Sequence, residues 1–234
     1  MSLIAWYKLD KLNGSGLVPD CSGNGLDGTP TDVSFVAGKI GQAAEFNGSS
    51  SLIDCGTGIS LIGLGPYSGF AWIYLNEFAS YKGIFSNGTA TAAGTRLSFG
   101  TYIYSGHNYL RLDVGDGTGY FASLSSADKI AAGAWYHVGF VRAADGYVTF
   151  YVNGQAAGGS ANARVLAAAS LPFEIGRNYH SSTYTLNGLI DDVRIVPAAL
   201  PAWMVREIHN HGRGTEKYDP WRRTVGGIYA RMAA

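Results

Sequence analysis

The stretch WYHVGFVRAADGYVTFYVNGQ, residues Trp135 to Gln155, carries the clearest structural signal in the chain. Apolar residues alternate with polar or small ones on both sides of Asp145-Gly146, and Asn153-Gly154 follows the second run. Asp-Gly and Asn-Gly are typical of tight hairpin turns, because these residues tolerate a positive φ angle. The stretch therefore predicts two antiparallel strands joined by a turn, with a second turn leading onward.

The same alternation recurs along the chain in short segments bounded by Gly, Asn, Asp and Ser. The other segments are LIAWYKL, AAEFNG, SLIDCG, GFAWIYLN, KGIFSNG, RLSFGTYIY, YLRLDVGDG, PFEIGRN and GLIDDVRIV. Their spacing predicts a β-sandwich. The composition agrees, since 33 glycines, 15 tyrosines and only 15% charged residues favour short strands with tight turns. No Pro-rich, Ser-rich or charged linker interrupts the series, so we expect one domain.

The pattern changes after Pro197, where apolar residues recur at helical spacing in PAALPAWMVREIHNHGRG. Four apolar residues share one side of such a helix: Leu200, Trp203, Met204 and Ile208. Gly212 is a suitable C-cap. The sequence beyond it has no clear period. We therefore expect a domain over residues 1–212, closed by one short helix, and an extended C-terminal arm over residues 213–234.

Charge and cysteine content exclude several classes of protein. Lysine plus arginine and aspartate plus glutamate each total 17, so a net charge of zero gives no field toward nucleic acid or an anionic membrane. No apolar run reaches membrane-spanning length. The N-terminus MSLIAWYKLD lacks a basic region and meets Lys8 early, so we expect synthesis in the cytoplasm without a signal peptide. Cys21 and Cys55 could form a disulfide, but free cysteines are favoured.

Six pieces of the sequence carry a resemblance to a known family. In chain order they are LIAWYKLD, DCSGNGLDGTP, AAEFNGSSSLIDCG, WYHVGFVRAADGYVTFYVNGQ, FEIGRN and LNGLIDDVRIVPAALPAWMVREIHNHG. From Leu3 to about Gly212 the chain resembles the laminin-G-like, concanavalin A-like jelly-roll family of lectin and glucanase domains. The resemblance implies an all-β fold of two antiparallel sheets packed face to face, with a short helix closing the domain.

The loop DCSGNGLDGTP, residues 20–30, concentrates oxygen ligands of the kind that calcium binds. The resemblance implies a calcium ion where this loop meets the strand GLIDDVRI. The implied ligands are Asp20, Asn24, the Gly28 carbonyl and Asp191. Such an ion would tie an N-terminal loop to a C-terminal strand, so its expected role is structural.

An alternative for this loop needs no metal. Asn24-Gly25 and Asp27-Gly28 would only form turns, and Asp20 would cap a backbone amide. The pattern does not favour an EF-hand, because Thr31 stands where the twelfth ligand, a glutamate, would be, and no helices flank the loop.

The sequence has no recognisable catalytic motif. Retaining β-glucanases of this fold carry Glu-x-Asp-x-x-Glu on one strand, because two carboxylates must flank the scissile bond. Here the glutamates are scattered, and no G-x-S-x-G, H-E-x-x-H or P-loop occurs. His209 and His211 lie two apart on the expected helix, where solvated positions are the simplest interpretation. We therefore expect a protein that is not an enzyme.

Sugar recognition combines aromatic platforms with a few hydrogen-bonding groups, and one region offers both. The candidate ligand-binding residues are Tyr102, Tyr104, His107, Tyr109, Tyr179 and Tyr184. Ordinary packing of tyrosines within a sheet is the alternative.

Two hypotheses for the function follow. The first is a non-catalytic interaction protein of a virion surface, such as a capsid decoration or fibre protein, with glycan binding; a leaderless sandwich followed only by an arm favours it by analogy. The second is a calcium-dependent carbohydrate-binding module of a cellular or secreted protein, located outside the cell. The arm carries residues typical of interfaces with other subunits: Trp221, Arg222, Arg223 and Tyr229. It could instead fold back on its own domain.

Overall fold

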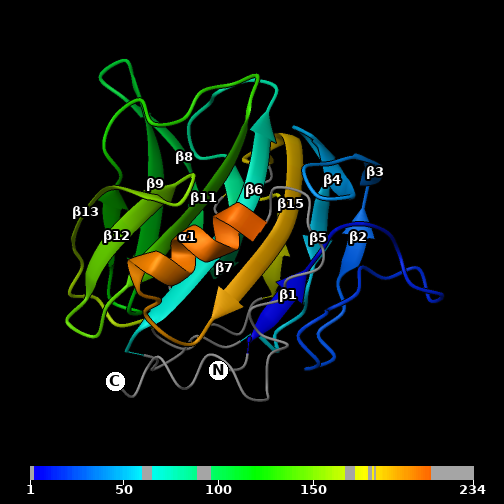
Figure 1. Ribbon diagram of the computed structural model, residues 1–234, viewed down its shortest axis with the longest axis horizontal. Helices are drawn as coiled ribbons and strands as arrows, with labels where there is room; N and C mark the ends of the chain where they lie inside the picture. Colours follow the sequence, from blue (N-terminus) through cyan, green and yellow to red (C-terminus); the bar gives the residue numbers. More distant parts are fainter. Residues whose placement is uncertain are drawn as a thin grey trace.

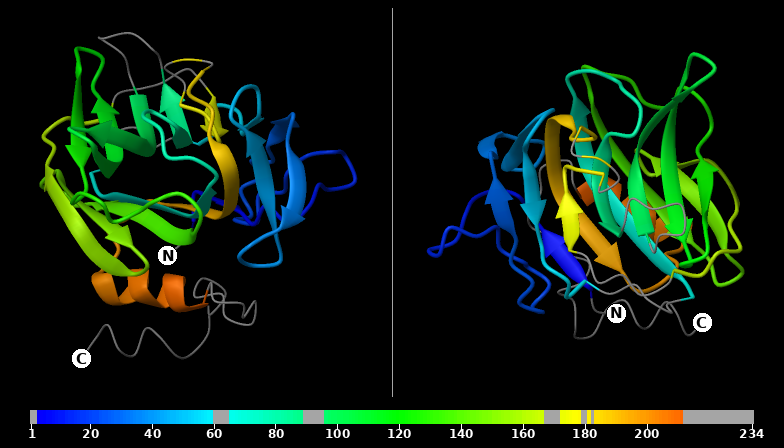
Figure 2. Two further views of the ribbon diagram at one scale, coloured as in Figure 1. Left: turned by 90° about the horizontal axis from the view of Figure 1, so that it is seen from above. Right: turned by 180° about the vertical axis from the view of Figure 1, so that it is seen from behind.

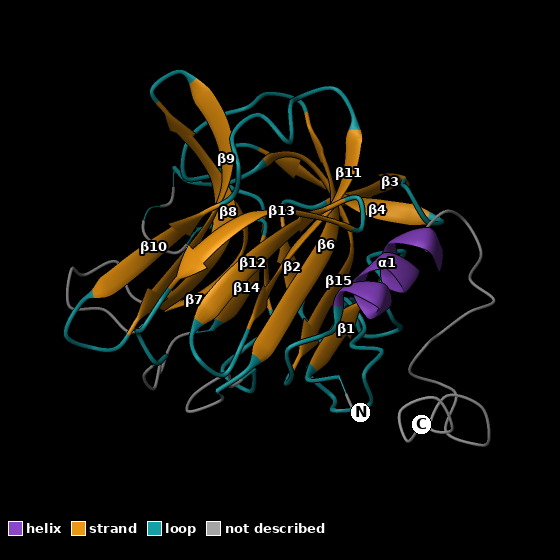
Figure 3. Ribbon diagram, turned by 60° about the vertical axis from the view of Figure 1, so that its left-hand side comes forward, coloured by secondary structure: helices purple, strands orange, loops and turns teal. Residues whose placement is uncertain are grey.

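Two antiparallel β-sheets pack face to face, and one helix covers the outer face of one sheet (Figure 1 and Figure 3). The computed structural model describes residues 3–59, 65–88, 96–166, 172–178, 181 and 183–211. This arrangement confirms the predicted all-β sandwich with a short helix near its C-terminal end. The proposed arm, residues 213–234, lies outside the described residues.

The first sheet has eight strands. In spatial order they are β13 (Gln155–Ala161), β12 (Tyr147–Val152), β11 (Trp135–Arg142), β6 (Tyr67–Leu75), β15 (Asn187–Val196), β4 (Gln42–Asn47) and β3 (Ser34–Ala37), and β1 (Ala5–Tyr7) also pairs with β15. The hairpin β11–β12 matches the sequence prediction, with Val138 opposite Val152 and Phe140 opposite Phe150. The turn after β12 uses positive φ angles of 50° at Asn153 and 75° at Gly154.

The second sheet has seven strands, and this sheet carries the candidate site. In spatial order they are β10 (Tyr120–Leu124), β9 (His107–Gly115), β8 (Arg96–Tyr104), β7 (Gly83–Gly88), β14 (Phe173–Ile175), β5 (Leu52–Asp54) and β2 (Thr29–Thr31). Side chains alternate between the two faces of each strand. Leu97 and Phe99 on β8 therefore point into the core, as do Leu112 and Val114 opposite them on β9.

Phenylalanines from both sheets meet in the core between them. Phe85 and Phe99 of the seven-stranded sheet lie 5.3 Å apart, centroid to centroid, and Phe99 lies 5.2 Å from Phe140 of the eight-stranded sheet. Phe150 and Phe173 extend the same cluster. All five are buried, and each such side chain stabilises the fold by about 1.5–3 kcal/mol.

Helix α1 (Ala202–His211) lies on the outer face of the eight-stranded sheet, away from the other sheet (Figure 2, left). Met204, Val205 and Ile208 are buried in one cluster with Phe70 of β6. The expectation that Trp203 shares this apolar side is wrong: its side chain is 47% exposed, because positions 204, 205 and 208 face the sheet.

The expectation that His209 is solvated is also wrong. Its ring is buried, 5.4 Å from Trp72 and 5.8 Å from His137 between centroids, because it projects from α1 onto the sheet. Gly212, the expected C-cap, and the side chain of His211 lie outside the described residues.

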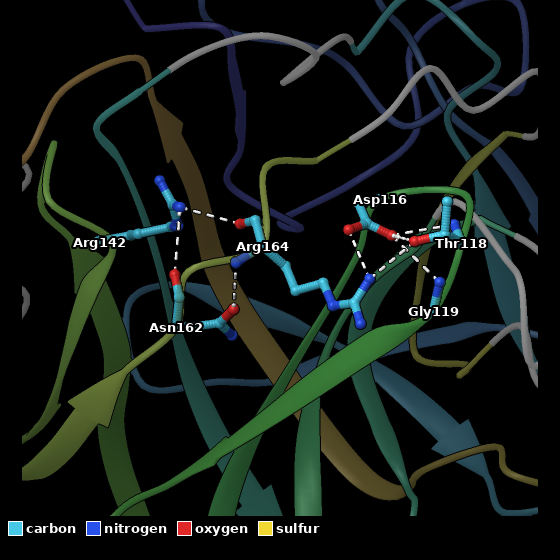
Figure 4. A network of polar contacts seen from close by, with 6 residues as sticks. All are labelled: Asp116, Thr118, Gly119, Arg142, Asn162 and Arg164. Atoms are coloured by element: carbon cyan, nitrogen blue, oxygen red, sulfur yellow. Dashed lines mark hydrogen bonds and ion pairs between the residues drawn. The ribbon is translucent and has the colours of Figure 1, made fainter.

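A polar network joins the two sheets at the β10–β13 edge (Figure 4). Arg142 of β11 is buried and donates hydrogen bonds to the carbonyls of Asn162 (3.3 Å) and Arg164 (2.9 Å) in the segment after β13. Arg164 in turn pairs with Asp116 in the turn between β9 and β10. The carboxylate of Asp116 also accepts the backbone N–H groups of Thr118 and Gly119. This network fixes the end of β9, the strand that supplies the central residues of the candidate site.

The two cysteines are free, as expected: Cys21 is exposed and Cys55 is buried. Among the residues that the structure describes, no helix has the length and apolar character needed to cross a membrane.

Candidate ligand-binding site

The outer face of the seven-stranded sheet gathers tyrosines at the β8–β9 hairpin. The register places Tyr102 opposite Tyr109 and Tyr104 opposite His107, so these four side chains share one face. The rings of Tyr102 and Tyr104 stack with their centroids 6.4 Å apart. Three of the predicted binding tyrosines thus lie together on the face that turns away from the core.

Arg111 of β9 lies at the centre of this face. Its guanidinium is 4.6 Å from the ring centroid of Tyr102 and 5.1 Å from that of Tyr81. Its Nε donates a 2.8 Å hydrogen bond to Asp113 on the same strand. Burial lowers the pKa of Arg111, but the Asp113 carboxylate more than offsets this, so the pKa lies above its ordinary value. The site therefore keeps a charged, planar donor group held against two aromatic rings.

Tyr81, in the connection between β6 and β7, has a left-handed backbone with φ of 64°. This conformation is unusual for a bulky residue. Two backbone hydrogen bonds to β8 hold it, from Tyr81 to the Thr101 carbonyl (2.7 Å) and from Thr101 to the Lys82 carbonyl (3.0 Å). The ring is thereby placed 5.1 Å from Tyr102 and 5.1 Å from Tyr184.

We call Tyr81, Tyr102, Tyr104, Tyr184 and Arg111 the aromatic–arginine cluster. A shallow depression adjoins it, with a lining that combines ring, hydroxyl, amide and charged groups. The lining residues are Tyr81, Ser98, Gly100, Thr101, Arg111, Asp113 and Asn178. Rings beside fixed hydrogen-bonding groups are the combination that binds polyhydroxylated ligands.

A second arginine–carboxylate pair lies on the same face. Arg177 binds Glu174 of β14 through two hydrogen bonds, Nε to Oε2 (2.8 Å) and Nη2 to Oε1 (2.5 Å). The register runs from Glu174 through Ser86 and Ser98 to Asp113 across four strands. Two buried carboxylates therefore share this face, and an arginine engages each of them.

The loop over residues 20–28 is organised by its own hydrogen bonds. Asp20 Oδ1 accepts the backbone N–H groups of Trp6 (3.0 Å) and Ser22 (2.9 Å), and its Oδ2 accepts that of Leu26 (3.2 Å). Asn24 donates from Nδ2 to the Leu3 and Ile4 carbonyls. The Gly28 carbonyl accepts the N–H of Val18 at 2.8 Å. Asp20 thus caps backbone amides, as the metal-free alternative for this loop describes.

Asp191 of β15, the fourth implied calcium ligand, contacts a different segment. Its Oδ2 accepts the N–H of Ile40 at 2.8 Å, while its Oδ1 is buried without a hydrogen-bond partner. Burial chiefly, with a contribution from the nearby carboxylates of Asp192 and Asp10, raises the pKa of Asp191 to about 8. No hydrogen bond joins Asp191 to the 20–28 loop within the described part of the chain.

Asp10 and the turn around Gly41 complete the surroundings of Asp191. Asp10 Oδ1 accepts the N–H of Gln42 at 2.9 Å, and it approaches so closely that a Cβ on Gly41 would lie 2.4 Å from it. Among the described residues, no group of three or more His, Cys, Asp or Glu side chains could hold a metal. The Oδ1 of Asp191 is thus a buried oxygen without a hydrogen-bond partner, whereas both carboxylate oxygens of Asp20 accept hydrogen bonds.

Comparison with known proteins identifies the family of this chain. A laminin G family model, described as the concanavalin A-like lectin/glucanases superfamily, matches residues 47–206, more than half of the chain. The chain belongs to this superfamily. No curated protein sequence matches it.

Solved structures show the concanavalin A-like fold in proteins of different kinds. Domain 4 of AbnA, a GH43 extracellular arabinanase from Geobacillus stearothermophilus in complex with arabinotriose, has a TM-score of 0.66 at 24% identity, covering 89% of this chain and 98% of that domain. The binding domain of Paraclostridial mosquitocidal protein 1 has a TM-score of 0.61 at 16% identity, covering 89% of this chain and 52% of the toxin chain. Trypanosoma rangeli sialidase in complex with sialic acid has a TM-score of 0.61 at 14% identity, covering 91% of this chain and 33% of the sialidase chain.

This concanavalin A-like domain therefore spans about half of the toxin binding domain and a third of the sialidase. At these identities the likeness establishes the fold alone.

The remaining predicted site residues do not join the aromatic–arginine cluster or are not described by the structure. His107 is on the same face but binds Asp128, with 2.6 Å between Nδ1 and Oδ2, and 55% of its side chain is exposed. Tyr179 lies outside the described residues, as do the proposed partner-binding residues Trp221, Arg222, Arg223 and Tyr229.

The sequence prediction missed Tyr81, Arg111 and Asp113. The alternation in YLRLDVG places Tyr109, Arg111 and Asp113 on one side of a strand, which could have indicated the last two. Tyr81 has no such signal, since its position depends on a positive φ angle and on hydrogen bonds to a distant strand.

Proposed function

We propose that this concanavalin A-like domain binds carbohydrate, without catalysis, on the outer face of its seven-stranded sheet. One observation carries the proposal: Asp113 binds Arg111, and the Arg111 guanidinium lies against the rings of both Tyr81 and Tyr102. The rings can pack against the C–H face of a sugar, while the arginine and neighbouring hydroxyls bind its oxygen atoms. The arabinotriose bound to the arabinanase domain supports a carbohydrate ligand.

The absence of catalysis stays a prediction with a physical argument. A glycosidase needs two carboxyl groups that flank the scissile bond. Asp113 and Glu174, the buried carboxylates of this face, each form an ion pair with an arginine. We expect no hydrolysis of β-glucans or arabinans by the purified protein.

We also propose a structural calcium ion, with Asp10 and Asp191 as its carboxylate ligands in place of the Asp20, Asn24 and Gly28 set. The support is the buried, unpartnered Oδ1 of Asp191 beside a second carboxylate. A bound ion would supply the positive charge that this buried group lacks, and it would tie β15 to the turn around Gly41.

The virion hypothesis rests on the arm, residues 213–234, which lies outside the described residues. None of the three structures named above is a virion component. Location on a virion or outside the cell, and docking of the arm on other subunits, stay hypotheses without structural support.

A glycan array followed by titration calorimetry tests the binding proposal, with arabino-oligosaccharides as the first probes. Arg111→Lys keeps the charge but loses the planar group over both rings, so we expect at least about tenfold weaker binding. Arg206→Lys on exposed α1 is the matched control and should bind as the wild type does. Absence of any glycan ligand, or equal affinity for the wild type and Arg111→Lys, would reject the proposal.

A further inference from the structure

Four tyrosine rings on the outer face of the seven-stranded sheet each contact the next. In order they are Tyr184, Tyr81, Tyr102 and Tyr104, which we call the tyrosine row. Successive ring centroids are 5.1, 5.1 and 6.4 Å apart. Three separate segments supply these rings: the segment before β15, the β6–β7 connection, and β8.

Specific hydrogen bonds fix these three segments to one another. The Lys82 ammonium donates a 2.9 Å hydrogen bond to the Thr183 carbonyl, which ties the segment of Tyr81 to that of Tyr184. Ser80 Oγ accepts the N–H of Ile103 at 2.9 Å, which ties the Tyr81 segment to β8. Because these hydrogen bonds join the three segments within the chain itself, the row needs little ordering when it binds a ligand.

We infer that the site takes an extended chain of several sugar units rather than one terminal sugar. This inference rests on the proposed carbohydrate binding and names the class of ligand. Successive rings are 5.1 to 6.4 Å apart, and the four rings come from three separate segments, so they offer more contact surface than one small sugar covers. A chain of several sugars can contact more of the four rings than a single sugar can.

The two end residues of the row, Tyr184 and Tyr104, should contact long ligands but not short ones. Tyr104 is 60% exposed, so its ring offers surface beyond the central contact of Arg111 with Tyr81 and Tyr102. Tyr184 is the other end member of the row, and its ring stacks on that of Tyr81. A short sugar at the centre gains nothing from either end, whereas a long one gains contact area at both.

Calorimetric titration with arabino-oligosaccharides of one to six units tests the extended-ligand inference. If the strongest array ligand is another glycan, the same length series of that glycan is used. We expect affinity to rise with length, with the hexasaccharide bound at least about tenfold more tightly than the monosaccharide. Equal affinities for the monosaccharide and the hexasaccharide would overturn the inference and leave the proposed function intact. If no glycan binds, both fail.

Variants at the ends of the row localise the effect. Tyr104→Ala and Tyr184→Ala should each weaken hexasaccharide binding several-fold and weaken it more than disaccharide binding, and Tyr104→Phe, which keeps the ring, should lose less affinity than Tyr104→Ala. Tyr147→Ala is the matched control, since Tyr147 is 46% exposed but belongs to β12 of the other sheet. If both end variants bind the hexasaccharide as tightly as the wild type does, the inference of an extended ligand is also contradicted.

Discussion

His137 of β11 is fully buried beneath helix α1, and neither of its ring nitrogens has a hydrogen-bond partner. Its ring stacks on Phe70 of β6 and also contacts Trp72 and His209. His209 of α1 and Arg194 of β15 are the titratable or charged groups that affect its pKa. Burial chiefly, together with the nearby His209 and Arg194 side chains, lowers its pKa to about 3. The packing of α1 on the sheet therefore requires a neutral His137.

The first prediction concerns stability in acid. The pKa of His137 is lower in the folded chain than in the unfolded chain, where it is about 6.5, so the unfolded chain binds the proton more readily. This contribution to stability is complete above pH ~6.5 and is lost as pH falls toward ~3, by about 1.4 kcal/mol per pH unit.

Urea unfolding of the wild type and of His137→Phe between pH 7.5 and pH 4.5 measures this loss. The variant keeps the ring packing but has no group to protonate, so its stability should fall less steeply than that of the wild type. Parallel pH profiles would show that His137 does not cause the loss.

The second prediction separates the two calcium arrangements. If Asp10 and Asp191 hold the ion, a chelator should lower the melting temperature of the wild type, because calcium binds only the folded state. Asp191→Asn should melt at the same temperature with calcium and with chelator.

Asp20→Asn is the discriminating variant, because Asp20 caps backbone amides. It should lose stability equally in calcium and in chelator. A wild-type melting temperature that ignores the chelator, with no calcium found by elemental analysis, would reject the ion.

At the scale of elements, Arg142 and the segment after β13 illustrate how a buried charge organises an edge of the sandwich. The guanidinium donates to three carbonyl groups, of Gly65, Asn162 and Arg164, and lies over the ring of Tyr67. Each carbonyl would lose a buried donor if the arginine were removed.

The third prediction is that Arg142→Met lowers the free energy of unfolding by about 2–4 kcal/mol, since several buried acceptors are left unpaired. Equilibrium urea unfolding measures this. Arg206→Met on the exposed side of α1 should change the stability by less than about 0.5 kcal/mol. Equal effects of the two substitutions would mean that the Arg142 contacts contribute little.

Elements with local signals were predictable from the sequence, and those without were not. The hairpin β11–β12 follows from alternation and from Asp145-Gly146, all within one short stretch. Helix α1 follows from its spacing, but the exposure of Trp203 depends on which side of the helix meets the sheet. The position of Tyr81 depends on β8, which is distant in sequence, so no local pattern reports it.

At the scale of the whole molecule, the order of strand segments was enough to predict a two-sheet sandwich. The candidate site was only partly predictable, because Tyr81, Tyr102 and Tyr184 come from distant parts of the chain. Three of the tyrosines proposed from sequence reach this cluster, while Arg111 at its centre was missed. Tertiary pairing decides which tyrosines meet, and alternation alone decides only which side of a strand they occupy.

The fourth prediction concerns residues 213–234. Both sheets and helix α1 lie within residues 3–211. We predict that deleting residues 213–234 leaves this sandwich folded, with an unchanged melting temperature. If the arm docks on other subunits, the deletion and Trp221→Ala should abolish or weaken assembly. A lower melting temperature of the truncated monomer would mean instead that the arm belongs to its own domain.

The central claim is that glycan binds over the aromatic–arginine cluster. The most direct measurement is a titration of the isotope-labelled protein with arabinohexaose, or with the strongest array ligand, followed by NMR chemical shifts. We predict saturable shifts that concentrate at Tyr81, Tyr102 and Arg111, including the Arg111 side-chain Nε–H, with little change on the face covered by α1. Shifts confined to other surfaces, or none at millimolar ligand, would contradict it.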